Sequence, residues 1–169
     1  TIANEYQEID TLFKILEYEY LKIAQEEHLK FELSVPQNFH QYQAKADIHL
    51  LERLLRNLIT NAIRYTPKGG VRLAARLAGD SLDVRVVDTG LGVPVEMRAR
   101  IFDEFFQIRN PLAGEKNVGM GLGLSIAKRL CALLDSSLHL STHFGLGSTF
   151  YFRLPMKVAA SRRRLRCPR

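Results

Sequence analysis

The stretch GMGLGLSIAKRL, residues 119–130, places three glycines at alternate positions directly before an amphipathic helix. Glycine is a poor helix former, so its repeated use at the start of a helix needs a physical reason. Under one hypothesis the glycines only make a tight turn. Under the other they bring backbone N–H groups close to an anion at the helix N-terminus. The rest of the chain bears on that choice.

Composition predicts one folded domain with a basic tail. The chain has 169 residues, 46% of them hydrophobic, which is enough for one well-buried core. Residues 157–169 hold six Lys or Arg and no acid, so residues 1–156 are formally neutral, with 18 basic and 18 acidic side chains. We expect residues 1–156 to form the domain and residues 157–169 to be a disordered tail. Basic tails can also contact nucleic acid or an anionic membrane. We assign neither partner to this one.

Other sequence features exclude several classes of protein. The two cysteines have neither metal-ligand spacing nor the density of a disulfide scaffold, so we expect a reduced, cytoplasmic chain. No apolar run approaches the roughly 20 residues that span a bilayer, so this segment should not insert into a membrane, although its parent could be anchored in the inner membrane. The sequence contains neither the Gly-Lys pair of a P-loop nor a G-x-G-x-x-G fingerprint.

Hydrophobic periodicity predicts alternating helices and strands. Helices are expected over residues 5–29, 48–65 (capped by Asp47), 95–106 and 122–134. Strands are expected over residues 31–35, 42–46, 71–78, 81–88, 136–142 and 148–154, with hairpin turns at 78–80 and 144–147. These elements predict an α+β fold, a two-layer α/β sandwich in which about three helices cover one face of a mixed five-stranded sheet.

Two asparagines in the predicted helix 48–65 are unusual. Asn57 and Asn61 are spaced i and i+4 at the edge of the apolar face, with Arg64 beside them. Asparagine is a mediocre helix former, so the pair either is exposed and bonds a neighbouring loop or serves a ligand. In the second case the amide oxygens would face a Mg²⁺ ion that also holds phosphates.

The segment VVDTGLGVP, residues 86–94, ends a predicted strand in Asp88, followed by Gly90 and Gly92. Asp before Gly is a common turn signature in its own right. A carboxylate beside unobstructed backbone can also accept a hydrogen bond from the exocyclic amine of adenine. Residues 107–118 predict a loop of about 12 residues, long enough for a flexible lid, on which Arg109 and Lys116 are either phosphate contacts or ordinary surface charges.

Taken in order, the motifs NLITNA (57–62), DTGLG (88–92), IFDEFF (101–106) and GMGLGLSIAKRL (119–130) resemble the N, G1, F and G2 boxes of the ATP-binding catalytic domain of sensor histidine kinases. That family belongs to the Bergerat-fold superfamily. GSTFYFRLP, residues 147–155, is similar to its closing strand, and the resemblance covers about residues 5–156.

The resemblance implies ATP and Mg²⁺ as cofactors. It implies that Asn61 is the principal Mg²⁺ ligand, that Asn57 contacts the metal or the phosphates, and that Arg64 acts with Asn61 in catalysis. Asp88 would bind the adenine amine. The remaining implied nucleotide contacts are Tyr65, Gly90, Gly92, Thr149 and, in the ATP lid, Lys116, Gly119, Gly121, Leu122 and Gly123.

The implied activity is transfer of the γ-phosphoryl group to a histidine. None of the five histidines here has the family's acceptor setting; His28 is nearest, at the end of the first predicted helix, where a solvated or capping role fits better. The implied partners are therefore a His-bearing dimerisation hairpin outside this chain and, downstream, a receiver domain. Two alternatives stay open. One is a degenerate regulatory module that binds ATP without transferring phosphate. The other is a gyrase-like ATPase, which would need a hydrolytic Glu on the helix of Asn57; the nearest acid, Glu52, lies about 140° around the helix and is a poor candidate.

Overall fold

The computed structural model describes residues 3–106 and 123–159. Its strands form one seven-stranded sheet in the order β1-β3-β7-β5-β4-β2, with β6 also paired to β7. All neighbours are antiparallel except β2 and β4, which are parallel. The strands are β1 (Glu5–Glu8), β2 (Lys30–Ser34), β3 (Tyr42–Ala46), β4 (Gly70–Ala78), β5 (Ser81–Asp88), β6 (His139–His143) and β7 (Gly147–Val158).

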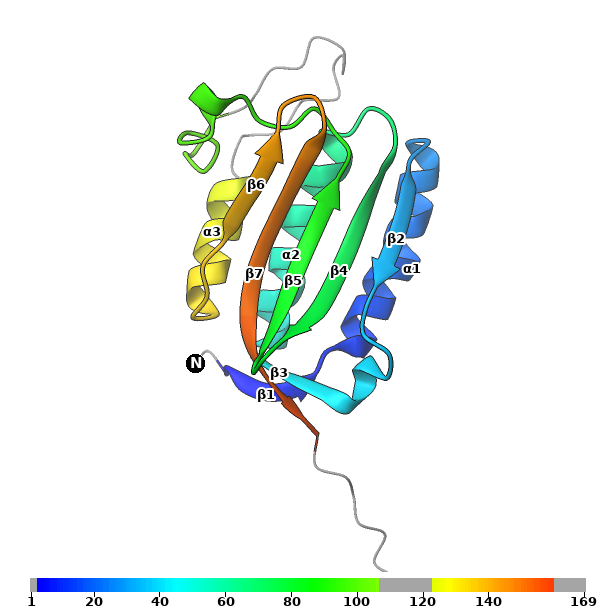
Figure 1. Cartoon of the computed structure of the whole chain (residues 1–169), viewed down its shortest axis with the longest axis vertical. Helices are drawn as coiled ribbons and strands as arrows, with labels where there is room; N and C mark the ends of the chain where they lie inside the picture. Colours follow the sequence, from blue (N-terminus) through cyan, green and yellow to red (C-terminus); the bar gives the residue numbers. More distant parts are fainter. Residues whose placement is uncertain (1–2, 107–122, 160–169) are drawn as a thin grey trace, which may run out of the picture.

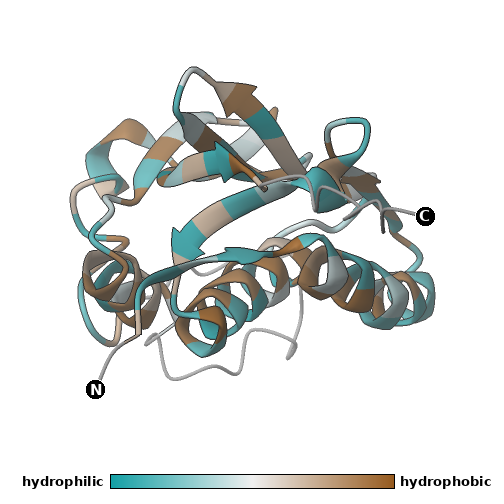
Figure 2. Cartoon of the chain, turned by 90° about the horizontal axis from the view of Figure 1, so that it is seen from below, coloured by the Kyte–Doolittle hydropathy of each residue, from teal (hydrophilic) through white to brown (hydrophobic). Residues whose placement is uncertain are grey.

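Three helices cover one face of this sheet and leave the other face open (Figures 1 and 2). They are α1 (Asp10–Glu26), α2 (Ile48–Arg64) and α3 (Gly123–Leu133), and two short 3-10 turns, η1 (Phe39–Gln41) and η2 (Val95–Met97), connect other elements. The predicted two-layer α+β class is therefore confirmed. The sheet has seven strands rather than the predicted five: each of the six segments expected to be strands is one, and β1, which pairs with β3, is the seventh.

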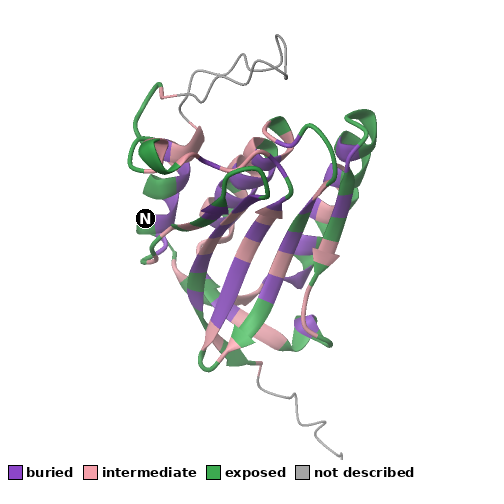
Figure 3. Ribbon diagram, turned by 45° about the horizontal axis from the view of Figure 1, so that its top comes forward, coloured by how far each residue is buried: buried purple, intermediate pink, exposed green. Residues whose placement is uncertain are grey.

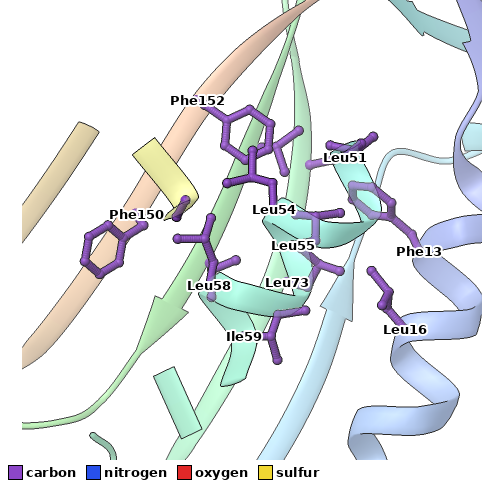
Figure 4. Packing of buried hydrophobic residues seen from close by; sticks show 14 of the residues in the cluster. Phe13, Leu16, Leu51, Leu54, Leu55, Leu58, Ile59, Leu73, Phe150 and Phe152 are labelled. Atoms are coloured by element: carbon purple, nitrogen blue, oxygen red, sulfur yellow. The ribbon is translucent and has the colours of Figure 1, made fainter. Parts of the chain in front are cut away.

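The central helix α2 positions most of the core. Asp47 caps it as predicted, since its carboxylate accepts hydrogen bonds from the backbone N–H groups of His49 (2.9 Å) and Leu50 (3.2 Å). Its apolar face is buried between the sheet and the neighbouring helices, where Leu54 and Leu58 meet Phe150 and Phe152 (Figure 4). Truncating one such leucine would cost about 2–5 kcal/mol, so these contacts stabilise the packing of α2 on the sheet.

The strands alternate buried and more exposed residues, as expected for a sheet covered on one face (Figure 3). The hairpin of β4 and β5 turns after Ala78 as predicted, with Arg76 paired to Asp83 and Val71 to Asp88. β7 extends to Val158 and pairs with Tyr42, so Lys157 and Val158, assigned to the tail from sequence, lie in a strand.

Two helix predictions need correction. Residues 5–8 form β1 rather than the start of a helix, because their backbone pairs with β3 and Glu8 then accepts a hydrogen bond from the backbone N–H of Thr11 in the first turn of α1. At its other end α1 stops at Glu26, and His28 takes a left-handed conformation with φ of 57°.

The predicted helix over residues 95–106 is also wrong. The chain makes the 3-10 turn η2 and then a series of i to i+3 hydrogen bonds, such as Asp103 to Arg100 and Phe106 to Asp103. Phe105 has a positive φ of 64°, which an α-helix cannot accommodate. The apolar side chains of Ile101 and Phe102 still reach the core, which explains the helix-like pattern.

Candidate functional site

A cleft opens where α2, the end of β5 and the start of α3 meet. One part of the lining is polar, from Asn61, Arg64, Asp88 and Ser148, and another part is apolar. The apolar side chains are Leu91, Val93, Ile101, Phe106, Leu124 and Phe150, and Tyr65, Gly92 and Gly123 complete the lining.

Asp88 is the most unusual side chain in the cleft. It is only 8% exposed, and no cationic side chain of the described residues pairs with it. One carboxylate oxygen, Oδ1, accepts hydrogen bonds from the backbone N–H groups of Gly90 (2.9 Å) and Ser148 (3.2 Å). Burial raises the pKa of Asp88 to about 6, although these two hydrogen bonds oppose the shift. A carboxylate left in this state can accept a further hydrogen bond from a ligand.

The glycines after Asp88 permit close backbone contacts. A Cβ on Gly90 would lie 2.4 Å from the carbonyl oxygen of Tyr65, at the end of α2, and a Cβ on Gly92 would lie 2.3 Å from that of His143. Gly92 also has a positive φ of 71°. The two glycines therefore let the segment after β5 pack between α2 and the β6–β7 turn, which forms one wall of the cleft.

Gly147 has a similar role that the sequence did not reveal. It has a φ of 119°, and a Cβ there would lie 2.1 Å from the backbone oxygen of Asp88. Beside it, the hydroxyl groups of Thr142 and Ser148 lie 2.8 Å apart, and Thr142 Oγ1 accepts a hydrogen bond from the N–H of Val93. These contacts join the β6–β7 hairpin to the segment that follows Asp88.

Asn61 is half-buried and lines the cleft, one turn after Asn57 on α2. Within the described part of the chain, neither side-chain amide makes a hydrogen bond. Asn57 does not line the cleft. Arg64 and Tyr65 follow at the end of α2; burial raises the pKa of the Tyr65 hydroxyl and the charge of Arg64 opposes that shift, so the hydroxyl stays protonated at neutral pH.

The structure thus brings together six of the predicted contacts: Asn61, Arg64, Tyr65, Asp88, Gly92 and Gly123. It does not bring Thr149 to the cleft, because Thr149 points to the opposite face of β7 from Ser148 and Phe150. Gly90 does not line the cleft but packs against the backbone of Tyr65 at the end of α2. Lys116, Gly119, Gly121 and Leu122 lie outside the described residues, as do the predicted lid and Arg109.

Sequence reasoning missed Ser148 and the apolar lining. Ser148 could have been found from strand pairing, since it lies directly opposite Asp88. The six apolar residues gave no separate signal, because in the sequence they are indistinguishable from core. Glu52, the acid weighed for a hydrolytic role, is instead held by Arg56 at 3.0 Å and does not line the cleft.

The two-layer fold and its cleft match a known family of ATP-binding domains. A family model described as "Histidine kinase-, DNA gyrase B-, and HSP90-like ATPase" matches residues 46–158. The chain belongs to this family, and within it is a catalytic domain of the sensor histidine kinase type, as the following comparisons indicate.

Among curated relatives, the sensor histidine kinase RcsC of Escherichia coli (strain K12) is 38% identical over 107 residues, which is 63% of this chain and 11% of RcsC. The sensor histidine kinase AruS of Pseudomonas aeruginosa is 35% identical over 142 residues, 81% of this chain and 14% of AruS. The chain therefore spans less than a fifth of the length of these relatives.

Solved structures agree with the fold. Full-length ShkA in complex with AMPPNP superimposes with a TM-score of 0.78 at 29% identity, over 95% of this chain and 33% of ShkA. The catalytic domain of the histidine kinase ThkA superimposes with a TM-score of 0.73 at 21% identity, over 89% of this chain and 95% of the ThkA chain.

In the described residues, none of the helices combines the length and apolarity needed to cross a bilayer.

Proposed function

We propose that this chain binds Mg-ATP and donates the γ-phosphoryl group to a histidine on a dimerisation hairpin outside it, as the catalytic part of a two-component sensor kinase. The observation that carries this proposal is Asp88, a buried carboxylate with no cationic partner among the described residues, at the polar end of an apolar cleft. A purine base fits such a cleft, since its faces are apolar and its amine can donate to the carboxylate.

Two further residues of the cleft lining are suited to phosphates. Arg64 supplies positive charge, and the amide oxygen of Asn61 is a ligand of the kind Mg²⁺ accepts when phosphate oxygens and water complete its coordination. Bound Mg²⁺ would neutralise charge on the β- and γ-phosphates. Gly123 leaves the backbone at the start of α3 open, since, apart from its chain neighbours and its own helix, no atom of the described residues lies within 4 Å of a Cβ built there.

The transfer step needs positioning and charge neutralisation rather than a general base in this chain. The histidine nitrogen forms a bond to the γ phosphorus while the bond from that phosphorus to the bridging oxygen breaks. ADP leaves with the electron pair of that bond, and the proton of the imidazole passes to solvent. Arg64 and Asn61 would hold the phosphates in line for this displacement.

Calorimetric titration of Mg-ATP into the chain tests the nucleotide site. We expect micromolar to submillimolar binding, with Asp88→Asn weakening ATP and ADP alike by about 100-fold, because the amide would turn a donor toward the adenine amine. Asn61→Ala should make binding less dependent on Mg²⁺. Arg53→Ala, at an exposed position of α2 outside the cleft, is the control and should bind Mg-ATP like the parent. A folded chain that binds no nucleotide would contradict the proposal.

A second assay separates a kinase from a regulatory module. A dimerising helical hairpin that bears the acceptor histidine is mixed with the chain and radiolabelled ATP. Transfer of label to the hairpin supports the kinase. Tight ATP binding without transfer, even to the native hairpin, would instead support the degenerate module.

A further inference from the structure

The open face of the sheet carries a cluster of three arginines around one buried carboxylate. Asp83 on β5 points away from the helices, yet its side chain is 0% exposed. Arg76 on β4 and Arg153 on β7 lie directly opposite it on the two neighbouring strands, and Arg85 lies two residues along β5 on the same face. The strand register therefore places this arginine cluster on the face opposite the helices, the face of the sheet that Figure 1 shows uncovered.

The cluster has more positive charge and more donors than Asp83 can use. The guanidinium nitrogens approach the carboxylate to 2.6 Å for Arg85, 3.4 Å for Arg153 and 3.8 Å for Arg76. Within the described residues, Asp83 is the only acid that pairs with any of them. Three guanidinium groups carry about fifteen N–H donors, against about four acceptor positions on one carboxylate. Arg76 is 65% and Arg153 61% exposed, so their remaining donors face outward.

Neighbouring aromatic rings fix part of this surface. The guanidinium of Arg85 lies 4.7 Å from the ring centre of Tyr151, and that ring stacks on His139 at 5.2 Å. Arg85 and His139 belong to strands on opposite sides of β7, so they cover both faces of the Tyr151 ring. A nucleic-acid base would need a free aromatic face to stack on, and Tyr151 offers none.

We propose that the arginine cluster is a docking surface for a carboxylate-rich face of a partner protein. Arg76 and Arg153 reach Asp83 from the strands on either side of β5 and keep outward-facing donors, so the surface offers two guanidinium groups to carboxylates of one protein surface. Residues 157–169 of this chain are basic and would be repelled from it. The inference is independent of the nucleotide cleft, which lies on the helix side of the sheet.

The test uses the ¹⁵N-labelled chain without nucleotide and hexaglutamate as the probe, followed by NMR at low and high salt. We expect shifts of the Nε–Hε signals of Arg76, Arg85 and Arg153, with affinity falling as salt rises. The double variant Arg76→Ala/Arg153→Ala should bind about tenfold more weakly, and Arg76→Lys/Arg153→Lys, which keeps the charge, should lose less.

The matched control is Arg53→Ala/Arg129→Ala, which removes the same charge from exposed positions on α2 and α3. It should bind hexaglutamate like the parent, and equal weakening would overturn the proposal. Tighter binding of inorganic phosphate or of oligouridine at the same signals would also overturn it, in favour of a small anion or of RNA. So would self-association in sedimentation that disappears in the Arg76→Ala/Arg153→Ala variant, because the occupant would then be a second copy of this chain.

Discussion

Asp83 and Asp88 lie five residues apart on β5, and both are buried, but they occupy opposite faces of the sheet. Asp83 is surrounded by three arginines on the open face. Asp88 faces the helices and, among the described residues, accepts hydrogen bonds from two backbone N–H groups and pairs with no cation, and burial raises its pKa to about 6. The charge of Asp83 is therefore compensated by arginines, whereas the charge of Asp88 has no cationic partner among the described residues.

The difference separates a carboxylate that stabilises the fold from one held ready for a ligand. Removing the partners of a buried charge is strongly destabilising, because it leaves a charge without compensation. A buried charge without a counter-ion costs free energy in the unliganded protein, and such groups concentrate at binding and catalytic sites. The following predictions test this contrast, in order of decreasing effect.

The largest expected effect is on stability at the open face. Asp83→Ala should lower the free energy of unfolding by about 3 kcal/mol, because three guanidinium groups would then face one another without a counter-charge. Urea denaturation measures the loss. Glu32→Ala is the control, since Glu32 pairs with Arg72 in an exposed bridge at 3.0 Å and should cost less than about 1 kcal/mol. Equal losses of stability in the two variants would show that Asp83 contributes no more to the fold than an exposed ion pair does.

Gly147→Ala tests the support of Asp88. We expect a loss of about 2 kcal/mol in the free energy of unfolding, because the new Cβ combines a positive φ with a clash against the Asp88 carbonyl. Gly145→Ala isolates the first factor, since Gly145 has a φ of 86° but, its chain neighbours aside, no atom of the described residues lies within 4 Å of the built Cβ. Urea denaturation should therefore give a smaller loss for Gly145→Ala, and the reverse order would show that the close approach is unimportant.

The affinity for adenosine should depend on pH through Asp88. With a pKa of about 6, the carboxylate is mostly ionised at pH 7.5 and mostly protonated at pH 5, where it has lost its charge and one acceptor. We expect binding about tenfold weaker at pH 5, measured with adenosine because it carries no titrating phosphate. Asn61→Ala, which retains Asp88, should show the same fall, and a flat profile in both proteins would exclude Asp88 from base binding.

Asp88→Asn should stabilise the unliganded domain by about 1 kcal/mol at pH 7.5 while it weakens nucleotide binding. The folded-state pKa of about 6 lies above the ordinary value of 3.8, so protonation stabilises the fold below pH 3.8 and this contribution is lost as the pH rises through about 6. The advantage of the variant should accordingly shrink between pH 7.5 and pH 4 in urea denaturation. A variant less stable than the parent at pH 7.5 would mean that ionised Asp88 supports the fold.

Several features could be predicted because they depend on residues close in sequence. The Asp47 cap, the apolar face of α2 and the β4–β5 hairpin follow from local spacing, and the structure confirms them. Asp88 and Gly92 were also found, because a strand that ends in Asp followed by glycines leaves a local signature. The role of the glycines was only half predicted: they were expected to support a base, and they are seen to permit close contacts with other backbone segments.

Other features depended on partners distant in sequence. Residues 5–8 carry a helix-compatible pattern, and only pairing with β3 makes them a strand. Thr149 was chosen from sequence where Ser148 lies opposite Asp88, since a one-residue difference in a strand decides which face a side chain occupies. The arginine cluster combines residues from three strands, so no local pattern predicts it.

The sequence by itself determined the fold class, the family and most of the polar groups of the cleft, because periodicity, caps and short motifs are local properties of the chain. The tertiary structure alone decided which groups are buried together: it aligned Ser148 with Asp88, closed Gly147 against the Asp88 backbone and gathered three arginines around Asp83. Burial and charge compensation are sums over neighbours in space, and the positions of those neighbours are set by strand pairing and helix packing.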